Sequence, residues 1–456
     1  MNSTVASEGP SQATVKGSYT YGSITDKIAD IVLERRTTPG FAIALAIAGA
    51  FTVLFIVAIA YLFATGVGIW GVNEPVAWAF ALTNFVWWVG IGHAGTFISA
   101  ILLLLRQKWR TSINRFAEAM TIFAVAMAGL MPILHLGRPW FFYWLIPYPD
   151  VMNVWPQWRS PLVWDIFAIS TYIIVSILFW YMGLLPDVAT LRDRAHKRWQ
   201  QVVYGLLALG WRGDARHWQR FDTTYLLLAG LATPLVISVH SVVSLDFSIG
   251  NVPGWHSTIF PPYFVAGALF SGFAMALTLG IPLRALFKLH DFITDRHLAN
   301  MAKLLLACGL IVDYSYAVET YTAFYSADRY ETYAIMNRMT GPYAWVYATV
   351  MFCNVVTPQL IWFKRIRAMP VVLFAIAAIV NVGMWLERFM IIVVSLHRDF
   401  LPANWGFFTP TFWDLATLAG SLGTFALLFL LFVRFLPAIS MSEMRKLNEE
   451  TRGVDR

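Results

Sequence analysis

Charged residues are scarce in this chain of 456 residues. Asp, Glu, Lys and Arg together make up 13% of the sequence, whereas soluble domains carry about 25%. Hydrophobic residues reach 58%, and the mean hydropathy is +0.61. These values exclude a soluble core as the main structure, and the long apolar runs predict helices that cross a membrane.

Cysteine is almost missing too, since the chain contains only Cys308 and Cys353. Both lie in apolar stretches without metal-ligand spacing, so we interpret them as small buried hydrophobic residues. A structural disulfide or an iron–sulfur cluster held by this chain is therefore not expected. The sequence also lacks a Gly-rich phosphate loop, a nucleophile elbow and a zinc motif. We predict no metal site.

The sequence does contain ten apolar runs of roughly 20 residues, the length that crosses a bilayer as a helix. It therefore predicts an all-α polytopic membrane protein with about ten transmembrane helices. The predicted spans are 40–66, 79–105, 117–137, 161–184, 223–245, 261–283, 303–325, 342–363, 371–395 and 411–435.

Lys and Arg are concentrated in every second loop, on one side of the predicted membrane. They occupy the N-terminal segment and the loops after spans two, four, six and eight, whereas the loop 246–260 has none. The positive-inside rule then places both termini in the cytoplasm, and the net charge of +7 does not indicate nucleic acid binding. We expect polar cytoplasmic tails at 1–37 and 440–456, the first with one amphipathic turn near 24–32. The aromatic loop 138–161 is expected on the membrane surface or beneath a partner protein.

Polar residues recur at the outer ends of spans three, four and five. They are His135, Arg138, Asp165, His240 and Asp246. Such residues are costly in a bilayer, so a cluster at one depth is a site hypothesis. A His and an Asp in an apolar pocket can accept and pass protons, as the oxidation of a hydroquinone requires.

We therefore predict His135 and Asp165 as catalytic residues, with His135, Asp165, Arg138 and His240 binding the quinol. Each residue also has a simpler interpretation. His135 is typical of an interfacial hydrogen-bonding residue, Arg138 of a cation that reaches the headgroups, and Asp165 of a helix N-terminal cap. What favours a site is the occurrence of His135 and Asp165 on consecutive spans at one level.

Five further residues lie deeper in the predicted spans. They are His93, Asp313, Glu319, Glu387 and Arg388. An unpaired charge there costs about 2.5–3.5 kcal/mol or more, so these residues indicate a buried structural network or a proton path. Because Glu387 and Arg388 are adjacent, we expect them to point in different directions and to need different partners.

Two other classes of membrane protein compete with this interpretation. A transporter would show helices broken by Gly or Pro at matched positions, and no clear pair of that kind is present. A dihaem cytochrome b would need two pairs of histidines. His135 and His240 match in expected depth, but His93 has no expected partner at its own level.

Four sequence strings are more specific than composition. They are GHAGTFISAILLLLRQKWR, MPILHLGRPW, SPLVWD and MWLERFMIIVVSLHRDFLP. With these strings the chain resembles the NrfD/PsrC-type membrane subunits of quinone-linked iron–sulfur oxidoreductases, over residues 40–435. Within that family it is most similar to the C-type membrane component of bacterial alternative complex III.

The resemblance implies two side-by-side four-helix bundles, 79–260 and 261–405, with peripheral helices in 38–78 and 406–439. It implies a quinol-binding subunit of a respiratory quinol:electron acceptor oxidoreductase that is not active alone. Menaquinol or ubiquinol would be oxidised near the extracytoplasmic face. The His of the family's HLGRPW motif maps to His135, and the Asp after SPLVW maps to Asp165.

The same resemblance implies the partners. These are an extracytoplasmic iron–sulfur subunit that takes the electrons, c-type cytochrome subunits, a homologous sister subunit and the lipid of a bacterial cytoplasmic membrane. No haem or iron–sulfur cluster is expected in this chain. The resemblance also implies a proton route through buried polar residues, for which His93, Asp313, Glu319, Glu387 and Arg388 are the candidates. The alternative function is a proton-translocating or structural subunit of the same type of complex without its own quinol site.

Overall fold

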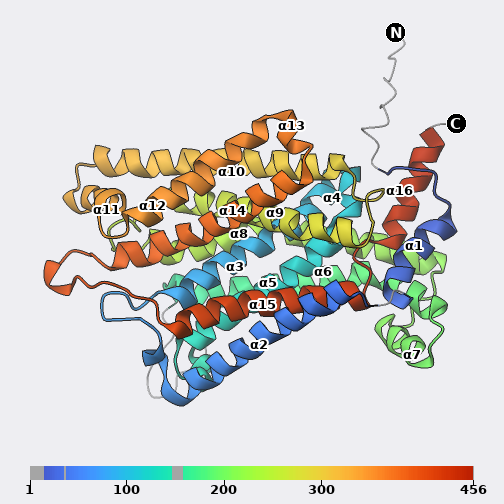
Figure 1. Ribbon diagram of the computed structural model, residues 1–456, viewed down its shortest axis with the longest axis horizontal. Helices are drawn as coiled ribbons and strands as arrows, with labels where there is room; N and C mark the ends of the chain where they lie inside the picture. The colour runs from blue at the N-terminus through green and yellow to red at the C-terminus, as the bar shows by residue number, and fades with distance from the viewer. Residues whose placement is uncertain (1–14, 35–36, 146–157, 455–456) are drawn as a thin grey trace, which may run out of the picture.

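The computed structural model describes residues 15–34, 37–145 and 158–454, and these ranges contain helices and no strand. Ten helical segments are long and apolar enough to cross a membrane, which confirms the ten predicted spans. They run side by side along the long axis of the molecule (Figure 1). The protein is therefore an all-α, multi-pass membrane protein.

Some of the ten membrane-spanning segments combine more than one helical element. The ten segments are α2 (Pro39–Thr65), α3 (Phe80–Thr96) continued through a π-helical stretch to α4 (Leu102–Leu104), α5 (Asn114–His135), α6 (Pro161–Arg194), α8 (Ala215–Ser248), α9 (Phe260–Leu286), α10 (Asp295–Tyr325), α12 (Ala344–Val350) continued to Trp362, α14 (Pro370–Phe389) continued to Val394, and α15 (Phe412–Phe435). The other helices are α1 (Tyr21–Leu33), α7 (Arg198–Leu207), α11 (Arg329–Thr340), α13 (Lys364–Arg367) and α16 (Met441–Val454).

Local sequence signals set the ends of the outer pair of spans. The Thr38 side chain accepts a hydrogen bond from the N–H of Phe41, and Pro39 begins α2. Gly66 ends that helix with φ of +87°, a conformation that favours glycine. Thr411 and Asp414 form a reciprocal capping box at the start of α15. These caps satisfy backbone groups that have no partner within the helix.

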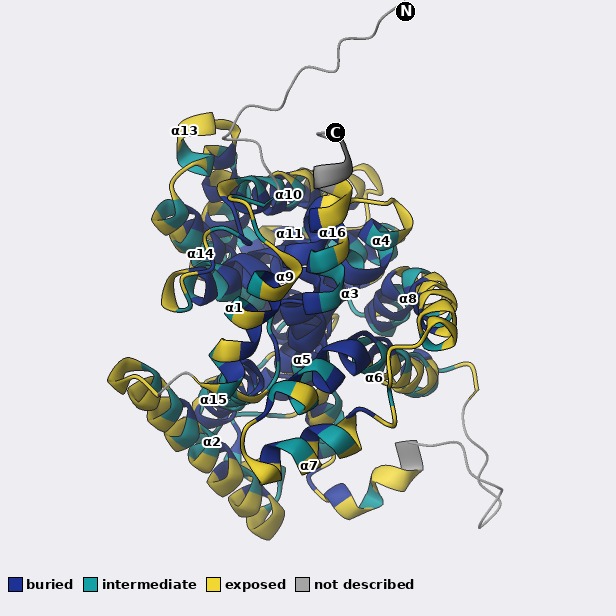
Figure 2. Cartoon of the chain, turned by 90° about the vertical axis from the view of Figure 1, so that its right-hand side faces the viewer, coloured by how far each residue is buried: buried dark blue, intermediate teal, exposed yellow. Residues whose placement is uncertain are grey.

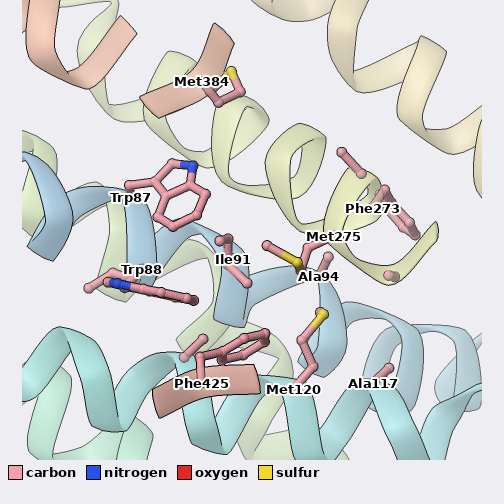
Figure 3. Close-up of a cluster of buried hydrophobic side chains, with 14 of the residues drawn as sticks. Trp87, Trp88, Ile91, Ala94, Ala117, Met120, Phe273, Met275, Met384 and Phe425 are labelled. Atoms are coloured by element: carbon pink, nitrogen blue, oxygen red, sulfur yellow. The ribbon is translucent and has the colours of Figure 1, made fainter. Parts of the chain in front are cut away.

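Helix α3 lies at the centre of the molecule, and every one of its residues is buried. It packs against α5, α9, α14 and α15, and Figure 3 shows Trp87, Trp88 and Ile91 of α3 among side chains from these neighbours. Glycines permit the closest approaches. A Cβ on Gly272 of α9 would lie 2.4 Å from the Cβ of Ala94. Small residues let membrane helices pack closely in this way.

The spans form two groups that share an interface. Helices α5, α6 and α8 lie with α3 on one side, and α10, α12 and α14 lie with α9 on the other. The contact between α3 and α9 joins the two groups. Helix α2 packs mainly on α15, and its outer face is exposed (Figure 2).

The first and last helices, α1 and α16, lie at one end of the molecule, which we call the proximal end; the opposite end is the distal end (Figure 1). Within the predicted polar tail 440–456, residues 441–454 form the helix α16. Its apolar stripe of Met441, Met444 and Leu447 is buried, although the segment as a whole is polar. The Arg445 side chain contacts Thr25 of α1, which is a full helix rather than one turn.

The aromatic loop predicted at 138–161 is described only at its two ends, because residues 146–157 lie outside the described ranges. Trp140 and Trp158 at these ends are more than half exposed. Trp140 follows the end of α5 and Trp158 precedes the start of α6, and these helix ends lie at the distal end (Figure 1).

Candidate functional site

Two carboxyl groups meet at the distal end of the first helix group. Asp165 lies one turn into α6, and Asp246 lies in the last turn of α8, which packs against α6. Their side chains interact directly with each other. Asp165 is 5% exposed, and the Oδ1 atom of each residue is buried without a hydrogen-bond partner in the described part of the chain.

This carboxyl pair, Asp165 and Asp246, is suited to proton transfer. A carboxylate accepts hydrogen bonds and cannot donate one, so two carboxyl groups in contact attract each other only when one carries a proton. The unpartnered Oδ1 atoms could accept hydrogen bonds from a hydroxyl group that enters the site. The pair therefore combines a proton store with hydrogen-bond acceptors.

His135 and Arg138 lie at the same distal end, where α5 finishes beside α6. His135 is half-buried, and its Nδ1 atom is buried with no hydrogen-bond partner among the described residues. No hydrogen bond joins His135 to Asp165 in that part of the chain. Arg138 is exposed, as expected for an interfacial cation. The structure thus brings Asp165 to Asp246, and places His135 at the same end without a hydrogen bond to either carboxyl group among the described residues.

His240 lies beside His93 rather than beside the carboxyl pair. The two imidazole rings have centroids 4.8 Å apart, and both residues are fully buried. His93 also stacks on Tyr172, with centroids 5.1 Å apart, and its Nδ1 lies 2.6 Å from the carbonyl oxygen of Val89. The Nε2 of His93 and both ring nitrogens of His240 lack partners among the described residues.

The helix geometry explains this placement. His240 and Asp246 are six residues apart on α8, which turns their side chains about 120° from each other and separates them by about 9 Å along the axis. One therefore faces α3 and the other α6. The expectation that His93 has no partner at its level is wrong. A cytochrome b is still not favoured, because the two rings are in direct contact and leave no gap for a porphyrin between them.

A second polar cluster lies inside the α9–α14 group. The Tyr316 hydroxyl donates to the Glu387 carboxylate, and the Asn354 amide donates to the same oxygen at 3.2 Å. The Arg388 guanidinium lies 3.2 Å from the other Glu387 oxygen and 4.2 Å from the ring centre of Phe264. Glu387 is 0% exposed, so its charge is compensated entirely by side chains.

The expectation that Glu387 and Arg388 have separate partners is therefore wrong in part. Adjacent residues on a helix point about 100° apart, but the long Arg388 side chain turns back toward Glu387 while stacking on Phe264. A built Cβ on Gly267 would lie 2.8 Å from the Arg388 guanidinium. The glycine leaves the space that this arrangement needs.

The other two predicted deep residues lie apart from this cluster. Glu319 pairs with Arg338 of α11 at 2.7 Å, and Arg338 also donates to the carbonyl of Gly254 at 2.9 Å. Asp313 is half-buried and accepts a hydrogen bond from Gln359 at 3.1 Å. Glu319 faces a distal cavity of 630 Å³ between the α8–α9 loop, α10 and α11.

Sequence reasoning missed a buried polar cluster at the proximal end. The Arg115 guanidinium pairs with Glu118 at 3.4 Å and with Asp187 at 3.2 Å, and the Tyr225 hydroxyl donates to Glu118 at 3.0 Å. Nearby, Arg110 pairs with Glu443 of α16 at 3.0 Å. A signal was present, because Arg115 and Glu118 are three residues apart and so share one helix face. The basic loop that precedes Arg115 in the sequence hid this signal.

The sequence profile described as "Polysulphide reductase, NrfD" matches residues 68–398. This range covers most of the chain and all spans from α3 to α14. The chain belongs to the NrfD family. The carboxyl pair, the histidines His93 and His240, and Glu387 with Arg388 all lie inside the matched range, whereas α2, α15 and α16 lie outside it.

A relative from Halobacterium salinarum carries the provisional name of a dimethyl sulfoxide reductase membrane subunit. It is 26% identical to this NrfD-family chain over 261 residues. The match covers 54% of this chain and 55% of the relative, so it spans about half of each protein.

Proposed function

We propose that this NrfD-family chain is the quinol-binding membrane subunit of a respiratory oxidoreductase. The observation that carries the proposal is the carboxyl pair at the distal end, in which Asp165 is buried, Asp246 is half-buried, and the Oδ1 atom of each lacks a hydrogen-bond partner among the described residues. His135 supplies a further unpartnered ring nitrogen at that end. A quinol ring needs apolar walls and hydrogen-bond acceptors for its two hydroxyl groups.

Oxidation of a quinol to a quinone releases two protons and two electrons. In this proposal Asp165 and Asp246 accept a proton from one hydroxyl, and His135 accepts or orients the other. Arg138 lies at the exposed rim, and in this proposal it positions the loop that follows α5. The electrons pass to an iron–sulfur subunit docked on the distal end, where Trp140 and Trp158 are exposed.

The distal end is then the extracytoplasmic face, and both termini lie in the cytoplasm, in keeping with the distribution of Lys and Arg in the loops. The name of the Halobacterium salinarum relative describes a reductase subunit, and a reductase needs an electron donor such as quinol. We propose the complex to be alternative complex III, with menaquinol or ubiquinol as donor, c-type cytochromes as further partners and a homologous sister subunit in the membrane.

A proton-translocating subunit is the second candidate, because three polar contacts occur along α8. Tyr225 contacts Glu118, His240 contacts His93, and Asp246 contacts Asp165. The longest interval, from Tyr225 to His240, spans about 22 Å of helix. Tyr172, Thr96 and Thr121 provide hydroxyl groups next to the histidines.

Turnover by the assembled complex distinguishes the two candidates. Asp165→Asn and Asp246→Asn remove a titrating group from the distal end, while Asp193→Asn on α6 and Asp222→Asn on α8 make the same change at exposed positions on the same helices. If quinol is oxidised here, the first two variants lose quinol oxidation and the controls do not. If the chain only conducts protons, quinol oxidation persists in uncoupled membranes and proton release falls.

A further inference from the structure

A groove of 880 Å³ opens at the proximal end, opposite the carboxyl pair. Its walls come from the end of α4 with the loop after it, from the first turns of α10, and from α13. The residues Leu102, Leu105, Ala299 and Leu304 give it an apolar wall. The groove therefore lies where spans end and where the headgroups of a bilayer leaflet would be.

Positive charge dominates the groove. Its lining includes five cationic side chains, and Asp295 is the one carboxylate among its described lining residues. The cations are Lys16, Arg296, Lys303, Lys364 and Arg367. Asp295 is already paired with Arg284 at 2.6 Å and with Lys16 at 3.4 Å, so it does not neutralise the rest.

Lys303 and Lys364 have no ion-pair partner in the described part of the chain, and both are exposed. Arg367 donates to the carbonyl oxygens of Ile361 and Trp362, at 2.7 and 3.0 Å, which orients its guanidinium without cancelling the charge. The groove thus holds a fixed arginine and two unpaired ammonium groups.

Lys303 lies near the membrane-entering end of α10, where an anionic partner can reach it. It lies eight residues into α10, about 12 Å from the start of the helix. Leu310 and Ile311, further along the same helix, are exposed on its lipid-facing side. A lysine at the edge of a span is suited to contact headgroups or another anion at that level.

We propose that this cationic groove binds an anionic glycerophospholipid. The lipid phosphate lies among Lys303, Lys364 and Arg367, and the acyl chains follow Leu102, Leu105 and Leu304. Cationic pockets between spans bind such headgroups, and the apolar wall favours a lipid over a soluble phosphate. The assignment does not depend on quinol chemistry, because none of these residues belongs to the distal site.

Binding of phosphatidylglycerol to the purified full-length chain, measured by native mass spectrometry, tests the proposal. The variant K303Q/K364Q removes both unpaired ammonium groups, and K197Q/R198Q removes two exposed cations near α7 as a control. We expect the first to weaken phosphatidylglycerol binding by ~30-fold and the control to change it by less than about twofold. Equal binding by both variants overturns the proposal, provided that thermal unfolding shows both are folded.

Two further arms separate the lipid from other anions. If a low concentration of inorganic phosphate displaces phosphatidylglycerol, the groove is a site for soluble anions and the lipid assignment is overturned. If phosphatidylglycerol remains bound in the assembled complex, the lipid assignment is supported. If the isolated chain binds the lipid but the assembled complex does not, the lipid assignment is overturned. An acidic surface of another protein in the complex would then cover the groove.

Discussion

The imidazole rings of His93 and His240 pack against each other inside the first helix group, with their centroids 4.8 Å apart. They come from α3 and α8, and three of their four ring nitrogens lack a hydrogen-bond partner among the described residues. Buried polar groups in native proteins are nearly always hydrogen-bonded. This histidine pair is therefore a place where a proton or a water molecule can be held.

Replacing His240 with Phe separates a structural role from a proton-handling role. Phe keeps an aromatic ring beside Phe264 and removes two unpartnered nitrogens, so we expect thermal stability to change by no more than about 1.5 kcal/mol. We expect quinol-dependent proton release by the complex to fall by at least tenfold. Thermal unfolding and proton release are both measured on the assembled complex. Unchanged proton release would show that the pair is only a packing contact.

Arg388 should be essential for stability because it neutralises a fully buried carboxylate. Removing one member of a buried ion pair costs about 3–5 kcal/mol, so Arg388→Ala is expected to reduce the amount of folded chain sharply. The paired change Glu387→Gln with Arg388→Met should recover most of it, since no unpaired charge is left. Arg365→Ala, at an exposed position, is the control. A stable Arg388→Ala chain would mean that Tyr316 and Asn354 suffice for Glu387.

The ion pair between Arg110 and Glu443 should anchor α16. Glu443 accepts from Arg110 at 3.0 Å and from Asn114 at 3.1 Å, so Glu443→Ala is expected to cost about 1.5–3 kcal/mol. Glu450→Ala, on the same helix, breaks an exposed pair with Lys108 and should cost less than about 1 kcal/mol. The measurement is thermal unfolding of both variants in detergent. Equal effects would mean that burial of Arg110 does not matter.

The ten spans could be predicted from the sequence because a bilayer demands a run of apolar residues, and hydropathy records that demand directly. The sequence does not predict which residues meet across the spans. Hydropathy does not say which face of α8 points at α3. Depth alone therefore groups His240 with Asp246, although the two side chains face different helices. Similarly, the polar sequence of 441–454 hid an apolar stripe that needs a partner surface to be recognised.

Acid should destabilise the loop after α14 through His397. Burial lowers the pKa of His397 to about 4, whereas an exposed histidine has a pKa of about 6.5. The unfolded chain then binds more protons between these values, so stability falls as the pH drops from about 6.5 toward about 4. His397→Gln should reduce this pH dependence. Thermal unfolding of both chains at pH 7.5 and pH 5 measures it, and an equal acid shift in the two would exclude His397 as the cause.

The proposed quinol site depends on the carboxyl pair at the distal end, so the rate of quinol oxidation by the assembled complex tests it most directly. Asp165→Asn and Asp246→Asn are measured beside Asp193→Asn and Asp222→Asn, with equal amounts of the chain in each complex. A general acid–base group contributes about 10²–10⁴ in rate, so losses of that order in the first two variants, with near-normal rates in the controls, are predicted. Near-normal quinol oxidation in both Asp165→Asn and Asp246→Asn would contradict the proposal.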